Sequence, residues 1–203
     1  MTLNREIFAR DERDPSSPLD FEDREGLRLT DLQTVGELNA AEVRNILASQ
    51  MKPRWKKMAT SKLLDDLIIR SLHEAMFGEV WDWAGKYRTK EMTIGLAPER
   101  ISTELKQLVE NAKYWLQVDQ PQEILEATCR LHHRLVEIHP FYNGNGRIAR
   151  EYIDLILHSL GQEPFTWGRG SADPEPVVRS KYIDAIHEAD RGNFQLLYDF
   201  VRS

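Results

Sequence analysis

The sequence predicts a mainly α-helical fold of about six to eight helices. Apolar residues recur at spacings of three and four along most of the chain, which places them on one face of a helix. Proline and glycine end these stretches, as at Pro140 and Gly161, and both are typical of helix boundaries. One segment, residues 89–95, carries threonine, methionine and isoleucine ahead of a glycine and a proline, which favours a short β-hairpin. This pattern is typical of the mainly α class.

The first 59 residues divide into an arm and a helix. Residues 1 to about 30 are rich in charge and proline, and Asp14–Pro18 predicts an extended arm. Asn39 can cap a helix that begins at Ala40. The apolar face of this helix would be formed by Val43, Ile46 and Leu47. We therefore expect residues 1–59 to form an N-terminal region, for which a regulatory role is open, and residues 60–203 to form the main domain.

The remaining helices follow from the same apolar periodicity. A helix after Ser61 would end at Gly78, because glycine commonly follows the last turn of a helix. Five later helices are marked by apolar residues over 101–116, 124–138, 148–156, 177–186 and 194–201. Pro140 ends the second of these five, since proline lacks an N–H group and disfavours helical geometry in the residue before it.

The composition excludes several classes of protein. Hydrophobic residues make up 41% of the chain and charged residues 30%, which excludes wholesale disorder. No apolar run is long enough to span a bilayer, and the charged N-terminus is no secretory signal. Cys129 is the only cysteine, which fits a reducing compartment and a cytoplasmic location. The net charge of −6 argues against a general nucleic-acid binder.

The segment from His139 to Arg150 carries the residues most typical of chemistry. Gly144 and Gly146 allow backbone N–H groups to approach a ligand closely, and the helix that follows adds a partial positive charge. Arg147 and Arg150 project from one face of that helix and can bind phosphate in a bidentate way. His139, on the other side of the loop, can act as a base near neutral pH. The segment therefore predicts a phosphate site beside a proton acceptor, as phosphoryl or nucleotidyl transfer requires.

This segment resembles the signature of the Fic (Fido) family, HxFx(D/E)GNGRxxR. The matching positions are His139, Phe141, Gly144, Asn145, Gly146, Arg147 and Arg150. Trp83–Arg88 with Ile94 and Gly95 resembles the segment that leads into the family's target-binding flap. Thr34–Asn39 resembles a subgroup called mobile mystery protein B, which is found beside a small helix-turn-helix partner.

The resemblance implies transfer of AMP from ATP to a hydroxyl side chain of a target protein. His139 would be the general base, and Gly144, Asn145 and Gly146 would hold the phosphates. Arg147 would neutralise charge, and Arg150 would hold the γ-phosphate. The flap, formed by Thr93, Ile94 and Gly95, would bind the target as an added β-strand. The resemblance also implies a bacterial toxin-like role with an antitoxin partner.

Asn143 departs from the family pattern, which has an acid there that helps to hold Mg²⁺ or Mn²⁺. An amide oxygen can still bind a hard cation, but without negative charge. Two alternatives to the transferase therefore stay open: a catalytically weak nucleotide-binding module, and a protein that uses the flap only to dock a partner. Transfer of another phosphate-containing group is a third. Gly146 favours AMP transfer, because a related phosphate-transferring subgroup has lysine at that position.

An inhibitory glutamate is a further feature of many family members, in the pattern (S/T)xxxE(G/N). No full match occurs in this sequence. The pattern places the glutamate four residues after the serine or threonine, whereas Glu37 follows Thr34 by three residues. We take Glu37 as the inhibitory candidate, and its ordinary interpretation is a carboxylate at the start of a helix. Inhibition by a separate protein is the alternative.

Overall fold

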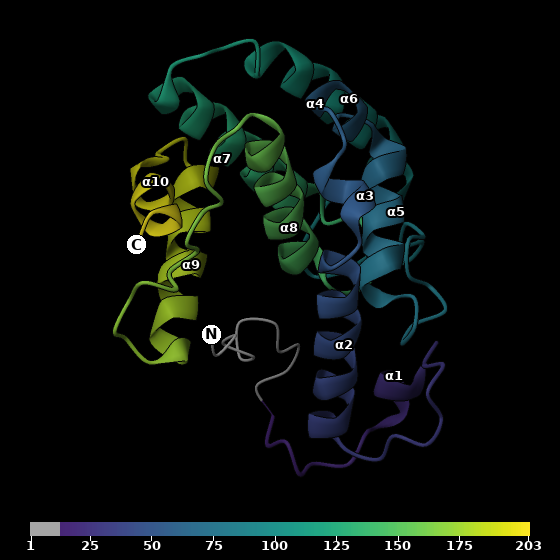
Figure 1. The fold of residues 1–203 in the computed structure, drawn as a ribbon. Helices are drawn as coiled ribbons and strands as arrows, with labels where there is room; N and C mark the ends of the chain where they lie inside the picture. The colour runs from purple at the N-terminus through teal and green to yellow at the C-terminus, as the bar shows by residue number, and fades with distance from the viewer. Residues whose placement is uncertain (1–12) are drawn as a thin grey trace.

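The computed structural model describes residues 13–203, and this range is built from helices with connecting loops (Figure 1). The mainly α-helical prediction is confirmed. Residues 1–12 of the expected arm lie outside the described range. In chain order the helices are α1 (Phe21–Arg24), α2 (Val35–Gln50), α3 (Pro53–Lys56), α4 (Thr60–Leu63), α5 (Asp66–Phe77), the 3₁₀ helix η2 (Pro98–Arg100), α6 (Ile101–Trp115), α7 (Pro121–Ile138), α8 (Asn145–Ser159), α9 (Glu175–Asp190) and α10 (Gln195–Val201).

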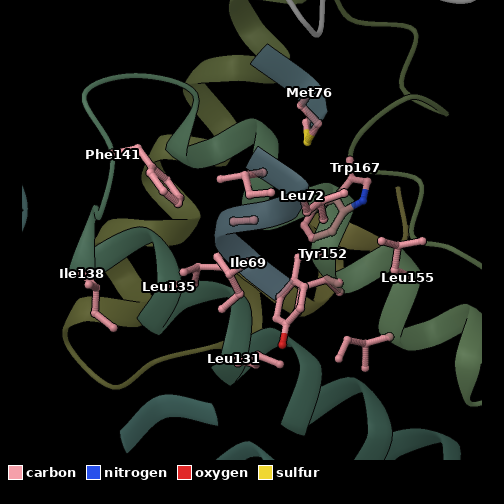
Figure 2. Packing of buried hydrophobic residues seen from close by; sticks show 14 of the residues in the cluster. Ile69, Leu72, Met76, Leu131, Leu135, Ile138, Phe141, Tyr152, Leu155 and Trp167 are labelled. Atoms are coloured by element: carbon pink, nitrogen blue, oxygen red, sulfur yellow. The ribbon is translucent and has the colours of Figure 1, made fainter. Parts of the chain in front are cut away.

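Helix α8 lies at the centre of the packing. It contacts α7 on one side and α5 on another, α6 packs on α7, and α9 pairs with α10 (Figure 1). Tyr152, Ile153 and Ile156 of α8 are completely buried, and Phe141 from the preceding loop joins the same hydrophobic cluster (Figure 2). Burial of each such side chain stabilises the fold by about 1.5–3 kcal/mol. The core therefore fixes both helices that flank the predicted phosphate loop.

The start of α2 differs from the prediction. The helix begins at Val35 rather than Ala40, and its cap is Thr34 rather than Asn39. The Thr34 hydroxyl accepts a hydrogen bond from the Glu37 N–H, and the Glu37 carboxylate accepts from the Thr34 N–H. This reciprocal capping box satisfies two amide groups at once, and it leaves Asn39 inside the helix rather than at its start.

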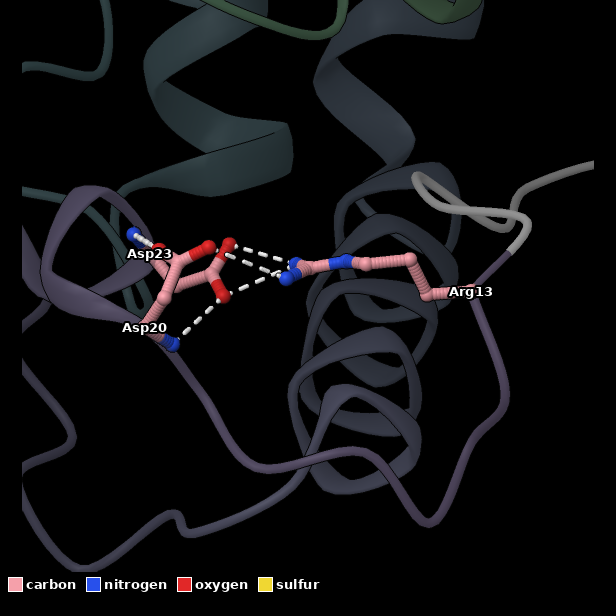
Figure 3. A network of polar contacts seen from close by, with 3 residues as sticks. All are labelled: Arg13, Asp20 and Asp23. Carbon is pink, nitrogen blue, oxygen red and sulfur yellow. Dashed lines mark hydrogen bonds and ion pairs between the residues drawn. The ribbon is translucent and has the colours of Figure 1, made fainter.

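The predicted extended arm runs across the start of α2. The Ser17 carbonyl accepts from the Val35 N–H, and the Pro15 carbonyl accepts from the Gly36 N–H. Arg13 binds the carboxylates of Asp20 and Asp23 (Figure 3). Nη2 of Arg13 donates to both carboxylate oxygens of Asp23, at 2.7 and 2.8 Å, and Nη1 donates to Asp20. These contacts hold the described part of the arm against the helical body.

The predicted β-hairpin is wrong as secondary structure. Residues 89–97 form a loop with bends and no strand. The Thr89 N–H donates to the Tyr142 hydroxyl, and the Leu96 N–H donates to the Ile138 carbonyl. These amides therefore bond to the loop and helix end around residue 140, and do not form a ladder of their own. We call residues 89–97 the flap loop.

Over residues 13–203, no helix combines the length and hydrophobicity needed to cross a bilayer. Helix α2 packs against α5, and its apolar residues Val35, Leu38 and Ile46 belong to the same hydrophobic cluster as those of α8. The N-terminal helix is thus part of the core that supports the predicted site.

Candidate active site

His139 lies at the C-terminal end of α7, where Pro140 stops the helix as predicted. Its backbone is left-handed, with φ 52° and ψ 60°. This conformation costs a residue with a side chain about 1–2 kcal/mol and persists only where its surroundings hold it. In the neutral ring one of the two nitrogens is unprotonated and can accept a proton. Burial lowers the pKa of His139, so the ring is a neutral base at pH 7.

Arg88 holds the backbone of His139 in place. Its side-chain Nε donates to the His139 carbonyl at 2.7 Å, and the backbone N–H of Arg88 donates to the Pro140 carbonyl at 2.9 Å. The same guanidinium donates to the carbonyls of Lys90 and Leu96, which lie in the flap loop. Arg88 is only 2% exposed. One buried side chain thus joins His139 to both ends of the flap loop.

The flap loop passes directly over His139. Gly95 has φ 97°, and a Cβ on it would lie 2.6 Å from the Cβ of His139. Only glycine permits this approach, because any side chain would overlap the histidine. Ile94 is 58% exposed at the outer side of the loop. Of the expected flap residues Thr93, Ile94 and Gly95, Gly95 lies against the histidine, and all three belong to a loop rather than a strand.

The residues between His139 and α8 form a tight turn. Gly144 adopts φ 80° as the N-cap of α8, and the first bond within the helix runs from the Ile148 N–H to the Gly144 carbonyl at 2.9 Å. The first backbone N–H groups of the helix therefore point along its axis toward the turn, with the positive end of the helix dipole. Asn145 shapes the turn with its side chain, which bonds to the N–H and carbonyl of Phe141 at 2.9 and 2.8 Å. This arrangement is suited to an anion.

A cavity of about 340 Å³ brings these parts together. It is lined by His139, by the turn from Asn143 to Gly146, by Arg147 and Arg150, and by Arg179 and other residues of α9. Its volume falls in the range of small-molecule sites, about 300–1,000 Å³. The predicted base and the predicted phosphate-binding residues therefore share one cavity.

The two motif arginines have different surroundings. Arg150 is half-buried beside Tyr182 of α9, with its guanidinium carbon 5.4 Å from the ring centre. Arg147 lies over the Phe77 ring at 4.7 Å and forms an ion pair of 2.6 Å with Glu42. Both arginines line the cavity, and Arg147 is ion-paired there with Glu42.

Asn143 fits poorly as a ligand for a divalent cation. Its Oδ1 accepts from the Gly144 N–H at 2.7 Å, and its buried Nδ2 has no hydrogen-bond partner among the described residues. Within residues 13–203 there is also no group of three His, Cys, Asp or Glu side chains arranged for a metal. The amide oxygen is thus engaged in its own turn, and the residues of this site do not fit a cation held by the protein.

Glu37 does not reach the motif arginines. Its carboxylate accepts from the Gln33 and Thr34 N–H groups at 2.7 and 3.0 Å, and these two bonds lower its pKa. Glu37 thus caps α2, and the glutamate of α2 that meets a motif arginine is Glu42. Glu42 lies five residues further along the helix and is fully buried.

Several residues of the site have no signal in the sequence. Glu42, Tyr182 and Arg179 reach the cavity or its arginines from helices distant in the chain, and none belongs to a recognisable motif. Arg88 had a signal, because it closes the Trp83–Arg88 segment that resembles the family pattern. His132 of α7, which carries no motif signal either, is buried with its Nε2 3.0 Å from the Tyr182 hydroxyl.

Comparison with known proteins identifies relatives over most of the chain. Protein adenylyltransferase fic-1 of Caenorhabditis elegans is 31% identical over 147 residues, which cover 68% of this chain and 26% of that protein. Protein adenylyltransferase VbhT of Bartonella schoenbuchensis is 26% identical over 140 residues, or 66% of this chain and 28% of that protein. The chain thus spans about a quarter of the length of these curated relatives.

Solved structures share the fold. The crystal structure of BepC from Bartonella tribocorum with bound AMPPNP superposes with a TM-score of 0.67 at 18% identity, over 98% of this chain and 97% of that one. Fic-1 of C. elegans superposes with a TM-score of 0.63 at 26% identity, over 81% of this chain and 48% of that one. Residues 63–157, which include the cavity's histidine and both motif arginines, match the Fic/DOC family. The chain therefore belongs to the Fic/DOC family.

Proposed function

We propose that this protein transfers AMP from ATP to a hydroxyl side chain of a target protein. The observation that carries the proposal is the shared cavity, in which the neutral His139 lies beside the anion-binding turn of α8. The names of its relatives support the same activity, since fic-1 and VbhT are both called protein adenylyltransferases.

The chemistry assigns a role to each part of the cavity. The unprotonated nitrogen of His139 would accept the proton of the target hydroxyl as its oxygen attacks the α-phosphorus of ATP. The bond between the α-phosphorus and its bridging oxygen breaks, and pyrophosphate leaves with the electron pair. The N–H groups at the start of α8 and the Arg150 guanidinium would stabilise the phosphate charge that develops. The flap loop would hold the target next to His139.

A divalent cation, Mg²⁺ or Mn²⁺, would enter with the phosphates of the nucleotide. Asn143 offers no charge to it, and its amide oxygen already accepts from Gly144. When bound, such a cation would neutralise phosphate charge. The protein's own contribution to that neutralisation comes from Arg150, Arg147 and Arg179, which line the cavity.

The biological setting is part of the proposal. A toxin-like role with a small antitoxin or helix-turn-helix partner, and membership of the mobile mystery protein B subgroup, rest on the resemblance of Thr34–Asn39. The relation of α2 to the site supports regulation through residues 1–59, because Glu42 of that region neutralises a motif arginine.

The test uses ATP labelled on either the α- or the γ-phosphate, with cell lysate as the source of targets. We expect label from the α-phosphate on protein with the wild type and loss of that label with His139→Ala. His158→Ala is the matched control, because His158 is exposed on α8 and does not line the cavity. Transfer of the γ-label would identify a kinase instead. ATP binding without transfer would identify a nucleotide-binding module, and a label that survives His139→Ala would contradict the role of the base.

A further inference from the structure

His73 is a buried histidine outside the motif that touches the anion-binding turn. It lies on α5 and is completely buried. Its Nε2 lies 3.0 Å from the carbonyl oxygen of Asn143, the residue that precedes Gly144. Its Nδ1 lies 3.0 Å from the backbone nitrogen of Gly85, which donates to it. The ring thus bridges two loops that are far apart in the sequence.

These two bonds determine which nitrogen of the ring carries the proton. The Gly85 N–H can only donate, so Nδ1 must be the unprotonated acceptor. The Asn143 carbonyl can only accept, so Nε2 must carry the hydrogen. A protonated ring would point an N–H at the Gly85 N–H. Burial lowers the pKa of His73 to about 3, and the nearby Arg147 acts in the same direction, so the ring stays neutral at pH 7.

Packing fixes the orientation of the ring as well. The His73 and Phe141 rings are stacked, with centroids 3.8 Å apart and planes at 16°. The Phe77 ring also lies against His73, with the centroids of the two rings 4.7 Å apart. A Cβ at Gly144 would lie 2.7 Å from the Phe77 ring and 3.4 Å from His73 Nε2. The turn is therefore pressed against His73 and Phe77, and it has no room to take a second position on that side.

We propose that His73 is a positioning residue that holds the Asn143–Gly144 turn in its anion-binding conformation through a hydrogen bond from Nε2 to the Asn143 carbonyl. That carbonyl precedes the N-cap of α8, so the bond sets where the first N–H groups of the helix point. His73 does not line the cavity and acts only through the backbone of the turn. The consequence for nucleotide binding rests on the proposed function, whereas the hydrogen bond itself does not.

Two substitutions separate the bonds of the ring. His73→Gln can place an amide N–H where Nε2 lies and so retain a donor to Asn143. His73→Asn can place an amide oxygen near the position of Nδ1 and so retain the acceptor for Gly85, while the donor to Asn143 is lost. Both lose the stacked ring, so both are expected to lower the unfolding midpoint. His133→Gln and His133→Asn are the matched controls, because His133 is a buried histidine that bonds to Asp190 away from the cavity.

Two measurements on the folded protein without nucleotide test the hydrogen bond. Nitrogen-15 shifts of the wild-type ring should show a protonated Nε2 and an unprotonated Nδ1. Amide hydrogen exchange at residues 144–148 should be faster by about tenfold in His73→Asn than in His73→Gln, because loss of a buried hydrogen bond changes an equilibrium by about that factor. The opposite tautomer, or equal exchange in the two variants, would overturn the proposal.

Calorimetric titration with the ATP analogue AMPPNP tests the consequence for binding. We expect Kd to rise about tenfold more in His73→Asn than in His73→Gln, and to stay at the wild-type value in both His133 variants. Equal Kd values in the two His73 variants would mean that His73 stabilises the fold without positioning the turn for nucleotide, and this result would overturn the proposal. If the wild-type protein binds no AMPPNP, this result would contradict the proposed function instead. The tautomer and hydrogen-exchange measurements would still decide the role of His73.

Discussion

The Glu42 carboxylate lies 2.6 Å from Nη1 of Arg147, which joins the N-terminal helix α2 to the first arginine of the motif in α8. The Glu42 side chain is fully buried and that of Arg147 is 6% exposed. The second carboxylate oxygen accepts from Trp81 Nε1 at 2.7 Å. Helix α2 thus supplies both core packing and the counter-charge of an arginine that lines the candidate active site.

Replacing Glu42 tests this pair. In Glu42→Gln the buried guanidinium of Arg147 would lose its counter-ion, and we expect the unfolding free energy to fall by about 3 kcal/mol. The affinity for AMPPNP should rise, because the charge of Arg147 is no longer neutralised and becomes available to phosphate. Denaturant unfolding and calorimetric titration measure the two effects. An unchanged unfolding free energy would show that the pair is absent in solution.

Glu37→Gln separates capping from inhibition. Glu37 is exposed, and its carboxylate accepts from backbone N–H groups at the start of α2. We expect a loss of about 1 kcal/mol or less in unfolding free energy, as for other helix caps, and no change in AMPPNP affinity. A marked gain in nucleotide affinity or transfer would restore Glu37 as the inhibitory residue.

Asn143→Asp tests the role of the metal. An aspartate can keep one oxygen on the Gly144 N–H and present a charged second oxygen at the position of Nδ2, which has no hydrogen-bond partner within residues 13–203. We expect the Mg²⁺ concentration for half-maximal transfer to fall about tenfold and the transfer rate to rise, because a carboxylate is a stronger ligand for a hard cation than an amide. Asn143→Ala, which has no oxygen, should show no such gain. An unchanged metal titration in the aspartate variant contradicts a metal role for this position.

The pH dependence of transfer reports on His139. A general base must be deprotonated, so the rate should be constant near neutral pH and decline as pH falls through the pKa of His139. Burial lowers that pKa from its ordinary value of 6.5, so the midpoint of the decline should lie below pH 6.5. Initial rates of α-label transfer from pH 4.5 to 8, with circular dichroism as a check on folding, measure it. A midpoint above 6.5 would mean that His139 is not the buried base.

Gly144→Ala and Gly146→Ala should differ sharply in stability. Gly144 has φ 80°, and an added Cβ would lie 2.7 Å from the Phe77 ring, so we expect a loss of about 2–4 kcal/mol. A Cβ at Gly146 would meet its nearest atom, the Tyr182 hydroxyl, at 3.8 Å, so the unfolding free energy should stay within about 1 kcal/mol of the wild type. Thermal unfolding of both variants checks the difference. Similar losses in the two would contradict the close contact at Gly144.

The prediction for the start of α2 failed although its signal was present. Thr34 and Glu37 have the spacing of a capping box, and this reciprocal pair prevailed over Asn39 as a single cap. The β-hairpin prediction for the flap loop failed for a different reason. Its amide groups bond to Tyr142 and Ile138, and only the tertiary structure brings these partners near.

The sequence by itself determined the longer helices from α5 to α10, the stop at Pro140 and the grouping of His139 with the glycines and arginines of the turn. These features depend on neighbours within a few positions, where periodicity and backbone preference suffice. Only the tertiary structure decided that Glu42 neutralises Arg147, that Arg88 joins His139 to the flap loop and that His73 supports the turn. Each of these contacts joins segments more than 50 residues apart, and the packing of α2, α5 and α8 into one core brings them together.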